Sequence, residues 1–305
     1  MFWSPTAGGA IWARRDRRAA LIVAAAILGG ILLAVVAVTA WPTFSDEHAY
    51  WTAAQRLAAG QPLYDAAAPT NQPYAYWYPP VLAQVLAPFT SVVSASAFTF
   101  FWTVLLIGCL WLLSGRDVVL TLAFIAFLPV ALELRVRNIH LVVAVLMVLA
   151  LRRSWVFWIP AAALKMAPAL GVVYLLAAGR KREAALVAGV GGLIATASYA
   201  LAPEAWGSFV AIASERAGAD TSGVVGLPYE FRLLAGGLLA LLAGRRGGRA
   251  GEIWVIVAIT LANPTLWVNA LSLLVAVVPL TRDANSFRRR LRVPSGDRAV
   301  IAARS

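Results

Sequence analysis

One acidic side chain stands where its position in the sequence suggests chemistry. Asp46 comes shortly after residues 19–40, an apolar run that contains no charged residue. A carboxylate at the edge of such a run is costly unless it is solvated or paired, which makes Asp46 a candidate catalytic group. Asp46 also follows Ser45, and both residue types cap helices well, so a structural role as a helix cap is the alternative.

Basic side chains form the second group of candidates. Lys165 falls between two short apolar segments, and Arg135 and Arg137 fall between two longer ones. A lysine or arginine in such a position can bind a phosphate or pyrophosphate through charge-assisted hydrogen bonds. Alternatively, each cation pairs with Glu133 or extends along its apolar stem to the membrane interface. We take Lys165 as the first candidate for binding phosphate.

Aromatic and amide residues could complete a binding site around these charges. Residues 74–78 hold four aromatic side chains directly before Pro79 and Pro80. Such a segment either belongs to the aromatic belt at a membrane interface or forms a rigid wall for a sugar or lipid. Residues 263–269 bring Asn and Pro into the last apolar stretch, which is tolerated where the backbone lines a polar cavity. A packing kink is the alternative there.

The sequence lacks the common nucleotide and metal motifs. It contains no Walker-type phosphate loop and no Gly-rich dinucleotide fingerprint, and its two histidines are His48 and His140. We therefore expect no metal site and no cofactor. The single cysteine, Cys109, lies in an apolar run and has no second cysteine with which to form an intramolecular disulfide.

The elements that position these residues are predicted to be membrane helices. Hydrophobic residues make up 61% of the chain and charged residues only 13%, with a mean hydropathy of +0.77, whereas soluble domains carry about 25% charged residues. We expect one all-α domain over residues 1–305, a polytopic integral membrane protein with about ten transmembrane or re-entrant helices. The expected segments are 19–40, 92–113, 118–133, 139–151, 154–164, 166–179, 184–202, 228–243, 252–263 and 265–281.

The charges predict how these helices cross the membrane. The net charge is +12, and most of the 26 Lys and Arg residues lie in short clusters on one side of the expected segments. The positive-inside rule then places both termini in the cytoplasm, residues 42–80 in a first extracytoplasmic loop, and residues 282–305 in a short basic cytoplasmic tail that contacts anionic lipids. No aromatic-rich basic face suggests a nucleic-acid partner.

The first extracytoplasmic loop is expected to contain a short helix at the membrane interface. Tyr50, Ala53, Ala54 and Leu57 recur at helical spacing, whereas Glu47, His48, Gln55 and Arg56 point elsewhere. Gly60 is expected to end this helix, and residues 61–64 then form a turn.

The order of motifs in residues 46–80 resembles that of glycosyltransferase family 87. These are polyprenyl-phosphate-sugar-dependent mannosyltransferases of the membrane-embedded C-type (GT-C) superfamily. The shared pattern is an aspartate after the first span, then Tyr-x-x-Ala, Gly-x-x-Leu-Tyr-Asp and Tyr-Pro-Pro. In this chain the matching residues are Asp46; Tyr50 and Ala53; Gly60, Leu63, Tyr64 and Asp65; and Tyr78, Pro79 and Pro80.

The remainder of the chain resembles the family more loosely. Looser matches are Asn138, Lys165 with Pro168, and Ser222 with Arg232. The chain departs from the family near its last apolar stretch. Relatives carry Pro-x-Ser-Trp followed by a histidine, whereas this chain has Pro264, Trp267 and then Asn269.

The resemblance implies a GT-C-like membrane hexosyltransferase. It would move a hexose, with mannose as first candidate, from a polyprenyl-phosphate donor to an extracytoplasmic lipid or glycan acceptor in the cell membrane. Asp46 would act as general base. The cations expected at the donor phosphate are Lys165, Arg135, Arg137 and Arg232. The residues expected to bind substrate are Glu47, Tyr50, Tyr64, Tyr76, Tyr78, Asn138, His140, Trp267 and Asn269. A lipid-linked-sugar flippase, a small-solute transporter and an inactive relative that serves as an assembly partner are the alternatives.

The charge pattern makes a topological prediction that cysteine labelling can test. In a Cys109→Ala background, Thr70→Cys should react with a membrane-impermeant maleimide from outside the cell. Arg182→Cys should react only after the membrane is permeabilised, because its basic cluster is expected in the cytoplasm. Labelling of both positions from the same side would contradict this topology.

Overall fold

The structure is a computed structural model that describes residues 19–26, 28–30, 45–64, 75–218 and 224–281. The described residues form helices and connecting turns and contain no strand, which confirms the all-α prediction. Part of the expected first span, the whole basic tail, Asp65 and Ser222 lie outside the described residues.

The number of membrane spans differs from the prediction. Within the described part, α4 (Ala95–Leu113) and α10 (Lys181–Leu201) are long and apolar enough to cross a membrane. Helices α5 (Val118–Ala126) and α6 (Leu128–Val136) qualify only as a pair, which is bent by 83°. The described residues thus hold two candidate spans, or three if this bent pair counts as one. The prediction of about ten transmembrane or re-entrant helices was wrong in its number of spans. Pro129 in the first turn of α6 lacks the N–H that would continue the helix from α5.

From residue 45 on, shorter helices and 3-10 turns make up the remaining described elements. They are α2 (Asp46–Ala58), α3 (Pro80–Thr90), α7 (His140–Arg152), η1 (Trp155–Phe157), α8 (Trp158–Leu164), η2 (Ala167–Ala169), α9 (Leu170–Ala177), α11 (Pro203–Gly218), α12 (Tyr229–Arg246), α13 (Gly248–Leu261), η3 (Val268–Ala276) and α14 (Val277–Thr281). Two short helices were expected to meet near Lys165, and they do: α8 ends there on extended backbone before η2 begins.

Helix α2 confirms the short helix predicted after the first apolar run. It buries Tyr50, Ala53 and Ala54, which repeat at helical spacing, and packs against α3 and α4. The helix ends at Ala58, and Gly60 then adopts a φ of 65°, a left-handed conformation that glycine takes without steric cost. The chain therefore turns where the sequence predicted a turn, and α2 presents its first residue, Asp46, toward the rest of the molecule.

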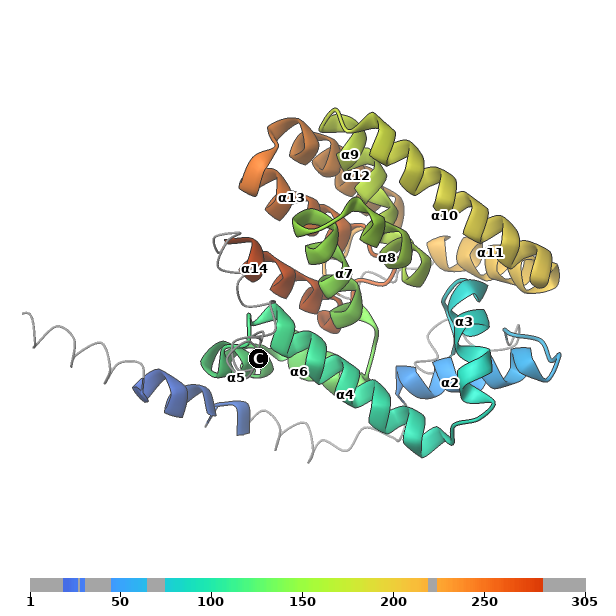
Figure 1. Cartoon of the computed structure of the whole chain (residues 1–305), viewed down its shortest axis with the longest axis horizontal. Coiled ribbons are helices and arrows are strands. Elements are labelled where there is room, and N and C mark those ends of the chain that lie inside the picture. Colours follow the sequence, from blue (N-terminus) through green and yellow to red (C-terminus); the bar gives the residue numbers. More distant parts are fainter. Residues whose placement is uncertain (1–18, 27, 31–44, 65–74, 219–223, 282–305) are drawn as a thin grey trace, which may run out of the picture.

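The elements meet around a central region in which distant parts of the chain lie together. Helices α9, α12 and α13 pack as one group, and α6 and α7 both pack against η3. In Figure 1 α10 runs along the outer edge of the molecule, with α11 beneath it and α2 and α3 below them. The first residues of α2, the α6–α7 turn, the α8–η2 junction and the segment before η3 all face this region. These four segments carry the polar residues of the candidate site.

Two glycines let α12 approach its neighbours closely. A Cβ at Gly236 would lie 2.8 Å from the backbone oxygen of Ala258, and a Cβ at Gly244 would overlap the backbone oxygen of Tyr174. Backbone atoms cannot swing aside as a flexible side chain can. The packing of α12 against α13 and α9 therefore depends on the absence of a side chain at these positions.

This packing predicts a difference between two glycines of the same helix. Gly244→Ala should destabilise the protein by about 1–3 kcal/mol, because overpacking forces neighbouring backbone to shift. Gly237→Ala is the matched control, since its Cβ would meet nothing within 4 Å and alanine favours a helix more than glycine does. Thermal unfolding in detergent measures both. Equal unfolding temperatures for the two variants would contradict the close approach.

Candidate active site

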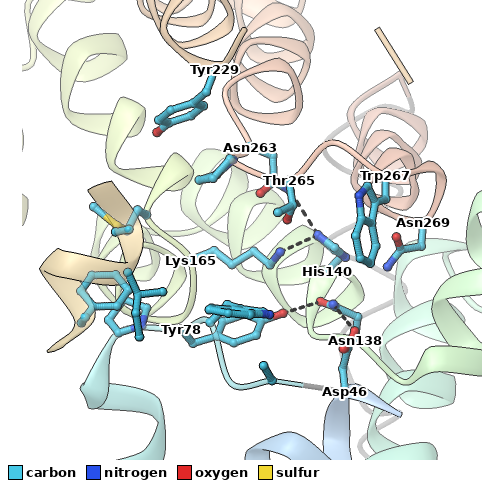
Figure 2. A pocket seen from close by; sticks show the side chains of 18 residues that line it. Asp46, Tyr78, Asn138, His140, Lys165, Tyr229, Asn263, Thr265, Trp267 and Asn269 are labelled. Carbon is cyan, nitrogen blue, oxygen red and sulfur yellow. Dashed lines mark hydrogen bonds between the residues drawn. The ribbon is translucent and has the colours of Figure 1, made fainter. Parts of the chain in front are cut away.

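A cavity of about 220 Å³ lies where these four polar segments meet (Figure 2). It collects residues that are far apart in the sequence. The site residues expected from the sequence that line it are Asp46, Tyr78, Asn138, His140, Lys165, Trp267 and Asn269. The first candidate base and the first candidate phosphate ligand are thus part of one cavity.

Hydrogen bonds hold the Asp46 carboxylate in a defined orientation. The Asn138 side-chain amide donates to Asp46 Oδ2, while Asn138 Oδ1 accepts from the Tyr78 hydroxyl at 3.0 Å. The Tyr50 hydroxyl donates in turn to that of Tyr78 at 2.9 Å. Because Asn138 Oδ1 also accepts from the Ile139 N–H at 2.7 Å, the amide can present only its NH₂ group to Asp46. Figure 2 shows this chain running from Tyr78 through Asn138 to Asp46.

The electrostatic surroundings of Asp46 suit a base that works near neutral pH. Burial raises the pKa of Asp46 from its ordinary 3.8 to about 7, because the charged carboxylate loses solvation. The Asn138 hydrogen bond and the Lys165 ammonium oppose this rise in pKa, whereas the carboxylates of Glu133 and Glu47 add to it. A group that is half ionised near pH 7 can both accept and release a proton.

Lys165 enters the cavity from the junction of α8 and η2. Its ammonium lies 2.7 Å from His140 Nε2 and 5.3 Å from the centre of the Tyr78 ring. The other ring nitrogen of His140 lies 2.9 Å from Glu133 Oε2. Burial lowers the pKa of Lys165 to about 8, while the carboxylates of Glu133 and Asp46 oppose that shift. Lys165 is thus still mostly charged at neutral pH.

The segment before η3 and the first residues of η3 form the facing wall of the cavity. Asn263 Nδ2 lies 3.1 Å from His140 Nε2, and Asn269 Nδ2 donates to Glu133 Oε2 at 3.2 Å. Asn269 therefore contacts the same carboxylate oxygen as His140. Trp267 lines the cavity with its side chain 42% exposed, which leaves its ring free to contact a ligand.

Arg232 supports this wall from behind. It is fully buried, and its guanidinium donates to the backbone oxygens of Leu227 at 3.0 Å, Asn263 at 2.5 Å and Pro264 at 3.0 Å. Its donors thus hold the loop in place, and Arg232 does not line the cavity. Arg232 was expected to bind the donor phosphate. In the structure its guanidinium positions the backbone of Asn263.

Arg137 and Glu47 contact each other outside the cavity. Arg137 Nη1 lies 2.9 Å from Glu47 Oε1, and the Thr99 hydroxyl donates to the same oxygen at 3.3 Å. Glu47 is only 2% exposed. Arg135, on α6, does not line the cavity either. The structure describes all four cations that were expected at the donor phosphate. Of these four, Lys165 alone lines the cavity.

Three tyrosines expected to bind substrate instead support Tyr78 and the prolines after it. The Tyr64 hydroxyl donates to the backbone oxygen of Tyr78 at 2.6 Å, and the Tyr76 hydroxyl donates to that of Pro79 at 2.8 Å. Tyr50, fully buried, reaches the Tyr78 hydroxyl. None of these three lines the cavity. They fix the course of the backbone, which directs the Tyr78 side chain into the site.

Sequence reasoning found only part of an apolar wall of the same cavity. Trp77 belongs to the aromatic segment for which a rigid wall was one of two alternatives. The members that it missed come from the residue before η2, from α11 and from the start of α12, and they are Met166, Phe209, Ile212, Ala213 and Tyr229. Apolar residues in an apolar chain carry no chemical signal, so only the packing of α11 identifies them. Glu133 was considered only as a partner for a cation, although a lone carboxylate inside an apolar segment is a signal in itself. No group of three or more His, Cys, Asp or Glu side chains within the described ranges could hold a metal ion.

Comparison with known proteins assigns the family. A model described as glycosyltransferase family 87 matches residues 76–291, which is well over half of the chain. The matched region contains Tyr78, Asn138, His140, Lys165 and Asn269, and it begins after Asp46. No curated protein and no solved structure matches the chain significantly. With its apolar helices and this match, the chain belongs to glycosyltransferase family 87 and is a membrane glycosyltransferase.

Proposed function

We propose that this protein transfers a hexose, with mannose as the first candidate, from a polyprenyl-phosphate donor to a lipid or glycan acceptor. The reaction takes place on the extracytoplasmic side of the cell membrane, with both termini in the cytoplasm. One observation carries the proposal: a carboxylate and an ammonium group, Asp46 and Lys165, line the same cavity. The resemblance of residues 46–80 to the family supports the same assignment for Asp46.

The chemistry needs one base and one cation. The acceptor hydroxyl oxygen attacks the anomeric carbon of the sugar, and the bond from that carbon to the phosphate oxygen breaks. Asp46 takes the hydroxyl proton, and the lipid phosphate leaves with the bonding electron pair. The Lys165 ammonium stabilises the negative charge that develops on the phosphate. Because the acceptor attacks opposite the leaving group, the anomeric configuration is inverted.

The aromatic and the aliphatic side chains of the cavity suit the sugar and the lipid of the proposed donor. Trp77, Trp267 and Tyr229 offer aromatic faces on which sugar rings stack, and Met166 with the α11 residues offers an apolar surface for the first units of the lipid. Binding pockets commonly combine such apolar walls with a few convergent polar groups.

Replacing Asp46 tests the proposed base. Asp46→Asn keeps the shape of the side chain and an oxygen that can accept from Asn138, and Ser45 rather than Asp46 is the N-cap of α2, so stability in detergent should hardly change. Hexosyl transfer from a radiolabelled polyprenyl-phosphate sugar should fall by about 10²–10⁴-fold, as expected for loss of general-base catalysis. In the wild-type protein kcat/KM should also fall about tenfold per pH unit below pH 7, because protonated Asp46 cannot accept a proton.

The neighbouring carboxylate provides the control for this experiment. Glu47→Gln should lower the unfolding temperature, because it removes the charge that pairs with Arg137. The transfer rate per folded molecule should stay within a few-fold of wild type and keep its acidic limb. Transfer that survives in Asp46→Asn but is lost in Glu47→Gln would move the role of base to Glu47.

Replacing Lys165 tests the proposed phosphate ligand. Lys165→Met should raise the KM for the polyprenyl-phosphate donor by about 10–100-fold, because a hydrogen bond to a charged group is worth about 1.5–3 kcal/mol. The KM for the acceptor should change far less. Arg135→Met is the matched control, since Arg135 lies outside the cavity lining, and its donor KM should change by less than about threefold. An unchanged donor KM in a well-folded Lys165→Met protein would refute the assignment.

A further inference from the structure

The buried partners of Lys165 determine which ring nitrogen of His140 carries a proton. Glu133 Oε1 accepts from the backbone N–H of His140 at 2.7 Å, and Glu133 Oε2 lies 2.9 Å from His140 Nδ1. Oε2 also accepts from the Asn269 amide at 3.2 Å. An ionised carboxylate has no proton to donate, so the contact with His140 is a hydrogen bond only if Nδ1 carries the hydrogen.

The contacts of the other ring nitrogen, Nε2, require that it carries no proton. His140 Nε2 lies 2.7 Å from Lys165 Nζ and 3.1 Å from Asn263 Nδ2. An ammonium group has only donors, and the Asn263 contact is made by its NH₂ group. Nε2 must therefore act as the acceptor for both. In Figure 2 the Lys165 and His140 side chains point toward one another across the cavity.

We propose that Glu133 and His140 are a positioning pair that fixes one tautomer of the imidazole and thereby holds the Lys165 ammonium at the cavity wall. Glu133 binds the Nδ1 proton, so that the Nε2 lone pair accepts from Lys165. The meaning of this arrangement for phosphate binding rests on the proposed function, whereas the tautomer itself does not.

Burial makes this arrangement necessary. Glu133 is fully buried, His140 is 2% exposed and Lys165 is 9% exposed, so water contributes little to any of them. The groups that face Lys165 are His140 from α7, Glu133 from α6, Asp46 from α2 and the ring of Tyr78. With the other tautomer, an N–H on Nε2 would point at the ammonium, and Lys165 would lose its hydrogen-bond acceptor.

The imidazole between the two charges also serves an anionic ligand. Glu133 does not line the cavity, whereas His140 and Lys165 do. A direct contact between Lys165 and Glu133 would bring a carboxylate next to any bound phosphate and repel it. The neutral ring separates the two, so the phosphate meets the cation while the carboxylate still stabilises the charge of Lys165 from behind.

Nitrogen-15 NMR of histidine tests the tautomer directly. The chain has two histidines, so His48→Gln leaves His140 as the single labelled residue. In detergent, near neutral pH, we expect one protonated and one unprotonated ring nitrogen, with the proton on Nδ1. A proton on Nε2, a doubly protonated ring or an averaged mixture of tautomers in the wild-type cavity would overturn the proposal.

Variants show whether Glu133 imposes this state. Lys165→Met should leave the proton on Nδ1, because the Glu133 carboxylate still accepts it. In the double variant Lys165→Met/Glu133→Leu no charged group binds either ring nitrogen, so the His140 spectrum should average over both tautomers. Lys165→Met/Glu252→Leu is the matched control: Glu252 is a partly buried carboxylate that pairs with Arg152 at 3.1 Å, outside the cavity lining, and its removal should leave the proton on Nδ1. Migration of the proton in Lys165→Met, or a proton that stays on Nδ1 in Lys165→Met/Glu133→Leu, would overturn the proposal. If the double variant does not fold, Lys165→Met alone decides.

Kinetics separate this inference from the proposed function. The Glu133 carboxylate raises the pKa of Lys165, so in Glu133→Gln the alkaline limb of kcat/KM should move to lower pH, with a raised donor KM. An alkaline limb that does not move in a folded Glu133→Gln protein would overturn the inference alone. If no polyprenyl-phosphate sugar supports transfer by the wild-type protein, the proposed function fails, while the NMR result still decides the tautomer.

Discussion

The candidate site depends on a single buried carboxylate. Glu133 is fully excluded from solvent, and taking an ion out of water costs several kcal/mol unless hydrogen bonds compensate. Its oxygens contact the backbone and ring of His140 on α7 and the amide of Asn269 on η3. His140 in turn contacts Lys165, so the ring lies between the carboxylate and the ammonium group. The need to satisfy one buried anion thus draws α6, α7, η3 and the α8–η2 junction toward the same point.

The remaining polar residues of the cavity are held in a comparable way. Arg232 binds backbone oxygens in front of η3, and Asn138 links Asp46 to Tyr78. Asp46, Lys165 and Asn269 therefore each have a neighbouring residue that fixes the orientation of the side chain. Preorganised groups of this kind stabilise developing charge without having to reorient during the reaction.

Base and cation come from segments that the sequence separates widely. Asp46 starts α2, and Lys165 follows α8. Both lie at helix ends, where the backbone is free to leave the helical path and direct a side chain into a cavity. The apolar wall that α11 contributes is different in kind, because its residues lie within a helix and meet the site only through packing.

Local sequence was enough to predict the features that depend on local composition. The apolar runs predicted a helical membrane protein, the spacing in residues 46–58 predicted α2, and the isolated charge of Lys165 marked the break between two short helices. Asp46 and Lys165 are candidates because a charge at the edge of an apolar run is costly wherever the chain folds. These inferences need only the cost of exposing or burying a residue type.

Tertiary structure alone decided how many helices are long enough to span and which charges meet. Hydropathy does not reveal the bend between α5 and α6, and it assigns several short helices the same apolar character as α4. Nor does the sequence reveal that Glu47 pairs with Arg137 or that Arg232 binds the backbone of a loop. It also does not reveal that His140 contacts both Glu133 and Lys165. A charge pairs with whichever partner the packing of distant helices brings within about 3 Å, and that distance is a property of the folded chain.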